Sequence, residues 1–257
     1  MHWFPLFLNL FALGTAGALA AVPAREIGRY FFKFHSTTVL VVVSVAALLG
    51  RPWEGLGSGT GVQRAAAAAA FLFAVVVLVQ NVVVRASAGD VEFRMILLPA
   101  LAGAAFAALA GCADRSPGEG LLLAVHLLTA AAVLGTALVA MTTGHWYLAN
   151  AQLPIGILVR LTGMHVLAVG LKAAVTATYG ILRFETYSGL EDFYKLVIGV
   201  RIGAGLILAM VLALMSLSCA KRKATQSATG ILYVSVVFVL IGETISLYLT
   251  LGTGRPI

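Results

Sequence analysis

The sequence predicts an all-helical integral membrane protein, and three observations support this fold class. First, 61% of the residues are hydrophobic and only 11% are charged, whereas soluble domains carry roughly 25% charged residues. Second, apolar runs of about 20 residues recur, the length that a helix needs to cross the hydrocarbon core of a bilayer. Third, these runs do not alternate with period two, which favours helices over the closed barrel.

We expect residues 1–257 to form a single polytopic transmembrane domain, a bundle of about eight helices. The first segment is interpreted as a retained helix, because no Lys or Arg precedes it as in a secretory signal. A duplication into two four-helix halves is a hypothesis, since the second and sixth segments each open with a base shortly before a histidine. The predicted segments are 4–22, 28–50, 65–85, 94–112, 120–144, 155–182, 194–218 and 229–251.

The basic residues at the ends of these segments predict an orientation. The connections after the first, third, fifth and seventh segments carry nine Lys or Arg against three Asp or Glu, and the opposite face carries six against six. The positive-inside rule places the first set in the cytoplasm. Both termini are therefore expected on the non-cytoplasmic side of a cell membrane, and we expect this to be a bacterial inner membrane. The net charge of +7 predicts contact with the lipid bilayer and no nucleic-acid partner.

Three ionisable residues, Lys172, Arg201 and Glu243, are predicted to lie within the membrane. A charged side chain at a helix centre costs about 2.5–3.5 kcal/mol on insertion scales, so it usually faces the protein interior and finds a partner. His126 is predicted in the same layer. One interpretation is a structural ion pair that joins helices. The other is a site for a ligand or for proton transfer, in which Glu243 and His126 exchange protons.

Two tyrosines are predicted to share helix faces with the buried cations. Tyr179 follows Lys172 by seven residues, and Tyr194 precedes Arg201 by seven, a spacing that keeps side chains on one side of a helix. We expect Lys172 and Arg201 to hold the electronegative end of a polar ligand such as a quinone. Tyr179 or Tyr194 would then hydrogen-bond the same ligand.

Two further patterns predict helix packing. Gly199 and Gly203 are four residues apart, and this small-xxx-small spacing favours the close approach of a neighbouring helix. Gln80 and Asn81, near the end of the third segment, are expected to hydrogen-bond across helices.

His35 and His165 are predicted at similar depths on different helices. Imidazole is a common axial ligand of haem iron, so this pair predicts a b-type haem site. A quinone or proton-relay role and a purely structural role are the alternatives. The sequence contains no clustered metal-binding motif, so no metal site is predicted.

Motifs of nucleotide-driven transport or hydrolysis are absent, since no P-loop, HExxH or GxSxG occurs. The favoured hypothesis is a membrane subunit of an electron-transfer complex, which holds a quinone, a b-haem or both and anchors redox partner subunits. Such a chain would at most be a quinone-reactive subunit of an oxidoreductase. The alternatives are a secondary transporter or proton-coupled channel using the Lys/Arg/Glu site, and a cofactor-free scaffold of a larger assembly.

Overall fold

The structure, a computed structural model, describes residues 3–57, 60–86, 93–112, 116–150, 152–182 and 191–253. In these residues every regular element is helical, which confirms the predicted all-α class. The chain divides into two compact units, Met1–Gly135 and Thr136–Ile257, called here the N-terminal and C-terminal units. The boundary lies inside one long helix and not in the connection between the fourth and fifth predicted segments. The hypothesis of two four-helix halves stays a prediction.

Six of the described helices are long and apolar enough to cross a membrane. The helix Trp3–Leu19 and the apolar stretch Leu97–Cys112 are shorter. A helix of 17 residues is about 26 Å long at about 1.5 Å per residue, slightly less than the ~30 Å hydrocarbon core. The structure therefore supports a membrane protein with six long apolar helices, and the count of eight spans stays a prediction.

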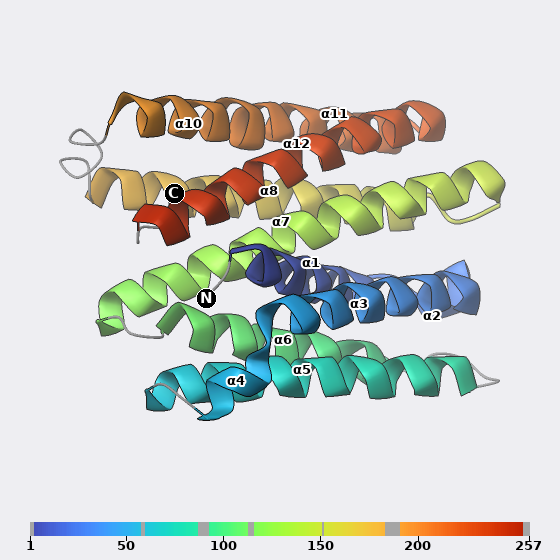
Figure 1. Cartoon of the computed structure of the whole chain (residues 1–257). Coiled ribbons are helices and arrows are strands. Elements are labelled where there is room, and N and C mark those ends of the chain that lie inside the picture. The colour runs from blue at the N-terminus through green and yellow to red at the C-terminus, as the bar shows by residue number, and fades with distance from the viewer. Residues whose placement is uncertain are drawn as a thin grey trace. The chain divides into compact units, whose positions relative to one another are not determined.

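In the N-terminal unit, α1 packs against α3 and α6, and α5 packs against both α3 and α6 (Figure 1). The buried rings of Phe73 and Phe106 lie in this unit. Gly28 separates two helices with a positive φ of 85°, a conformation that glycine adopts without steric cost. The helices are α1 (Trp3–Leu19), α2 (Ala24–Ile27), α3 (Arg29–Gly50), α4 (Pro52–Gly57), α5 (Gly61–Ala86), α6 (Phe93–Cys112) and the first part of α7 (Pro117–Ala149).

Small residues let α7 pack closely on α1 within this unit. A Cβ atom on Gly14 would overlap the backbone carbonyl of Ala131, and one on Gly135 would overlap the backbone of Gly14. Apolar side chains gain little by leaving lipid, so helix association in a membrane depends on such close van der Waals packing. These glycines are therefore needed for the observed contact between α1 and α7.

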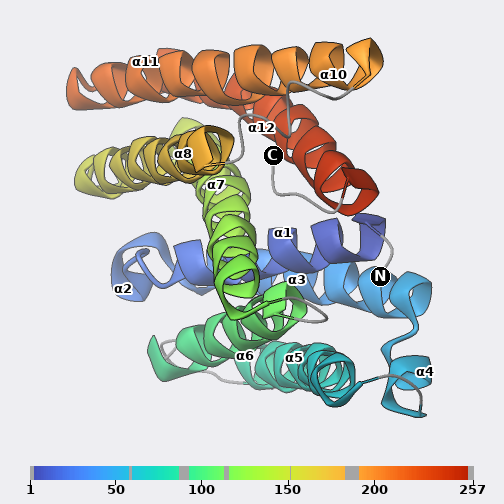
Figure 2. The same cartoon turned by 90° about the vertical axis from the view of Figure 1, so that its left-hand side faces the viewer.

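The C-terminal unit contains the predicted seventh segment as one long helical rod made of α10, η1 and α11 (Figures 1 and 2). Helix α12 crosses this rod and contacts all three of its parts, and α8 packs against α11. The middle part, η1, is π-helical, which the sequence did not predict. The elements are the end of α7, α8 (Gly156–Leu182), α10 (Asp192–Ile202), η1 (Gly203–Leu208), α11 (Ala209–Lys221) and α12 (Thr225–Thr253).

Candidate functional site

A buried cluster of three charged side chains joins α8, α10 and α12 in the C-terminal unit. Glu243 lies between two cations: its Oε2 is 3.1 Å from Nζ of Lys172, and its Oε1 accepts a hydrogen bond of 3.0 Å from Nη2 of Arg201. The side chains of Lys172 and Arg201 are 0% exposed and that of Glu243 is 1% exposed. The structure thus brings these three predicted residues into direct contact. We call them the Lys172–Arg201–Glu243 cluster.

The crossing of η1 over α12 next to this cluster depends on two glycines. A Cβ on Gly205 would lie 2.6 Å from Cα of Gly242 and 2.9 Å from Nη1 of Arg201. No side chain larger than hydrogen fits this gap without a shift of the backbone. The predicted close approach at Gly199 and Gly203 is wrong, because a Cβ on either residue would meet no described atom within 4 Å.

The reason for this difference is the position of each glycine relative to the buried Arg201. Gly199 and Gly203 lie two residues before and after Arg201, on the exposed side of the helix. Gly205 follows Arg201 by four residues, about one turn, so it lies on the buried face, within the π-helical turn η1. Single π turns occur frequently at functional sites, and this one begins two residues after Arg201.

The cluster contains more positive than negative charge. Two cations share one carboxylate, and the other described carboxylates of this unit, Glu191 and Asp192, are exposed. Nε and Nη1 of Arg201 are buried and have no hydrogen-bond partner among the described residues. Unsatisfied buried donors are costly, particularly on a charged group. The cluster therefore has both the charge and the donors to hold an electronegative group.

Polar side chains extend the cluster along α8. Thr176 lies one turn after Lys172, and its buried Oγ1 has no hydrogen-bond partner among the described residues. Tyr179 lies further along the same face and is 5% exposed. Tyr194, in contrast, is half-buried on α10, with its ring against that of Phe193. Of the two predicted tyrosines, Tyr179 is the one buried on the same helix face as a cation of the cluster.

His165 lies in a separate polar contact within the C-terminal unit. Its Nδ1 is 3.2 Å from Oγ1 of Thr136, and its Nε2 is 3.1 Å from Oγ of Ser235. All three residues are buried. An axial haem ligand needs one ring nitrogen for the iron, and in this arrangement both nitrogens of His165 face hydroxyl groups. This geometry is that of a histidine that joins α7, α8 and α12.

His35 and His126 lie in the N-terminal unit and are both buried. Nδ1 of His35 donates a hydrogen bond of 2.9 Å to the carbonyl of Phe31, one turn earlier on α3. The predicted haem pair His35 and His165 thus joins residues of two different units and stays a prediction. The same holds for proton exchange between His126 and the cluster.

Several residues of the site were not predicted from the sequence. Ser235 and Thr136, the partners of His165, resemble the many other hydroxyl residues of apolar helices, which usually bond to their own backbone. Gly242 precedes Glu243 directly, but nothing in the sequence pairs it with Gly205. Such partners depend on how helices cross, which local spacing does not determine.

The fold and the cluster define the class of the protein: an all-helical membrane protein with a buried, net-positive Lys/Arg/Glu site. No protein-family model matches the chain, and no curated protein shows significant similarity to it.

Proposed function

We propose that the protein is an integral membrane subunit of an electron-transfer complex and that the Lys172–Arg201–Glu243 cluster binds the polar head of a quinone. The observation that carries this proposal is the surplus buried positive charge, together with the unpaired Nε and Nη1 donors of Arg201. A quinone carbonyl oxygen is an electronegative acceptor on a ring that partitions into the membrane. It would satisfy these donors without adding a second buried anion.

The residues of the cluster would have different roles toward such a ligand. When bound, a quinone supplies two-electron, two-proton redox chemistry. Arg201 would donate hydrogen bonds to one carbonyl oxygen, and Lys172 would stabilise negative charge as it develops there. Glu243 would hold or release a proton at its carboxylate, since it is the buried acid among the described residues of this unit.

Further parts of the proposal concern the surroundings of the protein. Partner subunits would deliver the electrons. The chain would anchor these subunits to a bacterial inner membrane. The two shorter apolar helices would bring the number of spans to eight. The excess of basic residues after odd-numbered segments supports an orientation with both termini on the non-cytoplasmic side.

The direct test is the quinone content of the purified protein. We expect an organic extract of the wild-type protein in mild detergent to contain quinone close to one per chain. Arg201→Met removes the unpaired donors and leaves one cation against one carboxylate, so the fold should persist. A hydrogen bond to a charged group contributes about 1.5–3 kcal/mol, so quinone retention should fall about ten- to hundredfold.

Arg160→Met is the matched control, because Arg160 is an exposed arginine on α8. It should retain quinone at the wild-type level. The proposal fails if the wild-type extract contains no quinone and the protein binds no added short-chain quinone, or if Arg201→Met retains as much as the control. A visible spectrum of the same sample tests the haem prediction, since a Soret band lost in His35→Ala or His165→Ala would assign a ligand.

Transport is the second candidate function, and the same surplus positive charge favours it. Buried ionisable residues within a membrane protein mark substrate and ion pathways as well as redox sites. In that case the surplus charge would bind an anion, with Glu243 as the proton-coupling group. Anion uptake into proteoliposomes that depends on a proton gradient and is lost in Arg201→Met would support transport over electron transfer.

A further inference from the structure

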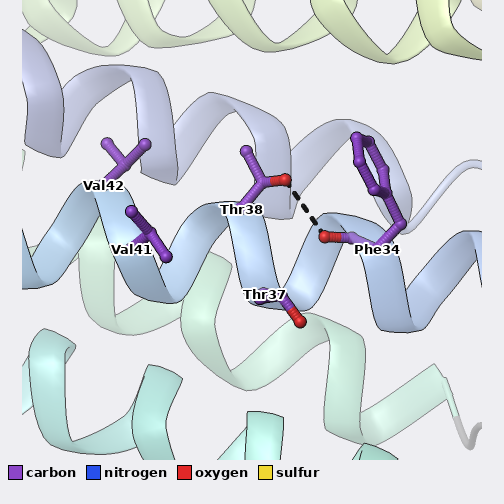
Figure 3. A pocket seen from close by; sticks show the side chains of 5 residues that line it. All are labelled: Phe34, Thr37, Thr38, Val41 and Val42. Atoms are coloured by element: carbon purple, nitrogen blue, oxygen red, sulfur yellow. Dashed lines mark hydrogen bonds between the residues drawn. The ribbon is translucent and has the colours of Figure 1, made fainter.

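A groove lies on the exposed side of α3 in the N-terminal unit (Figure 3). Its volume is about 270 Å³. The lining consists of two valines, a phenylalanine and two threonines, and Phe34 and Val41 are 53% and 56% exposed. One threonine hydroxyl already donates to the backbone of its own helix, Thr38 to the carbonyl of Phe34 at 3.0 Å. The wall is therefore almost wholly apolar. The lining residues are Phe34, Thr37, Thr38, Val41 and Val42.

A guanidinium group is held at Thr37, on the edge of this groove. Nη2 of Arg85 on α5 donates to Oγ1 of Thr37 at 2.8 Å, and its Nε donates to Oδ1 of Asn81 at 3.1 Å. Asn81 in turn donates to Oγ of Ser36 at 3.1 Å, which confirms its predicted hydrogen bond across helices. Arg85 itself is exposed. Two hydrogen bonds thus fix the orientation of a charged group that still faces the surroundings.

A second cation lies at the same end of the groove. Lys33 precedes Thr37 by one turn of α3, and its carbonyl accepts a hydrogen bond of 2.7 Å from that hydroxyl. Residues four apart share a face of a helix. From Lys33 to Val41 the helix rises about 12 Å. The surface therefore changes from basic at the start of α3 to apolar about two turns further on.

We infer that this surface binds an anionic phospholipid. The phosphate would lie against Arg85 and Lys33, and an acyl chain would follow the groove past Phe34, Val41 and Val42. The charge complementarity favours an anionic headgroup over a zwitterionic one. In the proposed orientation this end faces the cytoplasm, where anionic lipids attract basic residues close to the membrane surface. The inference does not depend on the quinone site, which lies in the C-terminal unit.

The test measures lipid binding to the full chain by native mass spectrometry, with phosphatidylglycerol and phosphatidylcholine of equal chain length added to the purified protein. A basic residue near the membrane surface contributes about a fivefold gain in affinity for anionic lipid. We expect phosphatidylglycerol to bind at least about fivefold more tightly than phosphatidylcholine. Arg85→Gln should lower its affinity by about the same factor, whereas Arg64→Gln, at the other end of α5, should leave it unchanged.

A second pair of variants tests the groove separately. Val41→Trp fills the groove and keeps Arg85, so it should reduce phosphatidylglycerol binding. Val45→Trp is the control, because Val45 is 40% exposed on the same helix and does not line the groove. Equal binding of the two lipids would overturn the inference, as would equal losses in a variant and its control. Loss with Arg85→Gln but not with Val41→Trp would show a phosphate site without a lipid groove and would also overturn it.

Discussion

Because Lys172 and Arg201 share the carboxylate of Glu243, the loss of stability on removing each charge should differ, and mutation can test the charge balance of the cluster. Glu243→Gln removes the group that contacts both cations. Breaking a buried ion pair from one side costs about 3–5 kcal/mol, because charge is left buried without compensation. Arg201→Met and Lys172→Met each leave one cation against one carboxylate, so either should cost only about 1 kcal/mol.

Thermal unfolding of the purified protein in detergent measures this difference. For a chain of this size about 1 kcal/mol shifts Tm by about 2–4 °C. Glu243→Gln should therefore lower Tm by roughly 6–20 °C, and either methionine variant by about 2–4 °C. The triple variant Lys172→Met, Arg201→Met, Glu243→Leu should be nearly as stable as the wild type, since apolar replacements of a buried ion cluster are often neutral.

Equal losses of Tm in Glu243→Gln and Arg201→Met would refute the reasoning. That result would mean that the charges are not buried together or that solvent neutralises the surplus. A triple variant less stable than Glu243→Gln would also contradict it, because packing and not charge would then dominate.

Two other predictions test the packing around the site. Gly205→Ala and Gly242→Ala should each destabilise the protein by about 1–3 kcal/mol, as overpacking does. Gly199→Ala is the control and should leave Tm unchanged or raise it, since alanine favours a helix over glycine by about 0.5–1 kcal/mol. Equal changes of Tm at all three positions would disprove the crossing of η1 over α12. Ser235→Ala removes a hydrogen-bond partner of the buried His165 and should lower the stability of the protein by about 1–3 kcal/mol. Ser227→Ala, at an exposed serine of the same helix, is the control and should not change Tm. An unchanged Tm in Ser235→Ala would argue against the contact between Ser235 and His165.

Much of the helical structure could be predicted from the sequence, because hydropathy along a membrane helix is a local property. The segment 155–182 corresponds to α8, and 28–50 to α3, within a residue or two at each end. Hydropathy alone did not show the short helix α4 in the connection after α3. It also could not show η1, since an apolar stretch satisfies its backbone in lipid as either an α- or a π-helix.

The charged residues of the candidate site could be predicted from the sequence, but the contacts between them could not. A Lys, an Arg and a Glu in apolar segments must find each other or a ligand, because an isolated charge in a membrane is costly. Which oxygen of Glu243 faces which cation depends on the angle at which α8, α10 and α12 meet.

The sequence alone determined that the chain is helical, that it belongs in a membrane, and that Lys172, Arg201 and Glu243 are its costly buried charges. These properties follow from composition and from the transfer cost of each side chain, which need no knowledge of neighbours. Only the tertiary structure decided that Gly205 and not Gly199 meets α12, that both nitrogens of His165 face hydroxyl groups, and that Arg85 lies beside an apolar groove. Each of these depends on a contact between residues distant in the chain, which only the packing of the helices brings together.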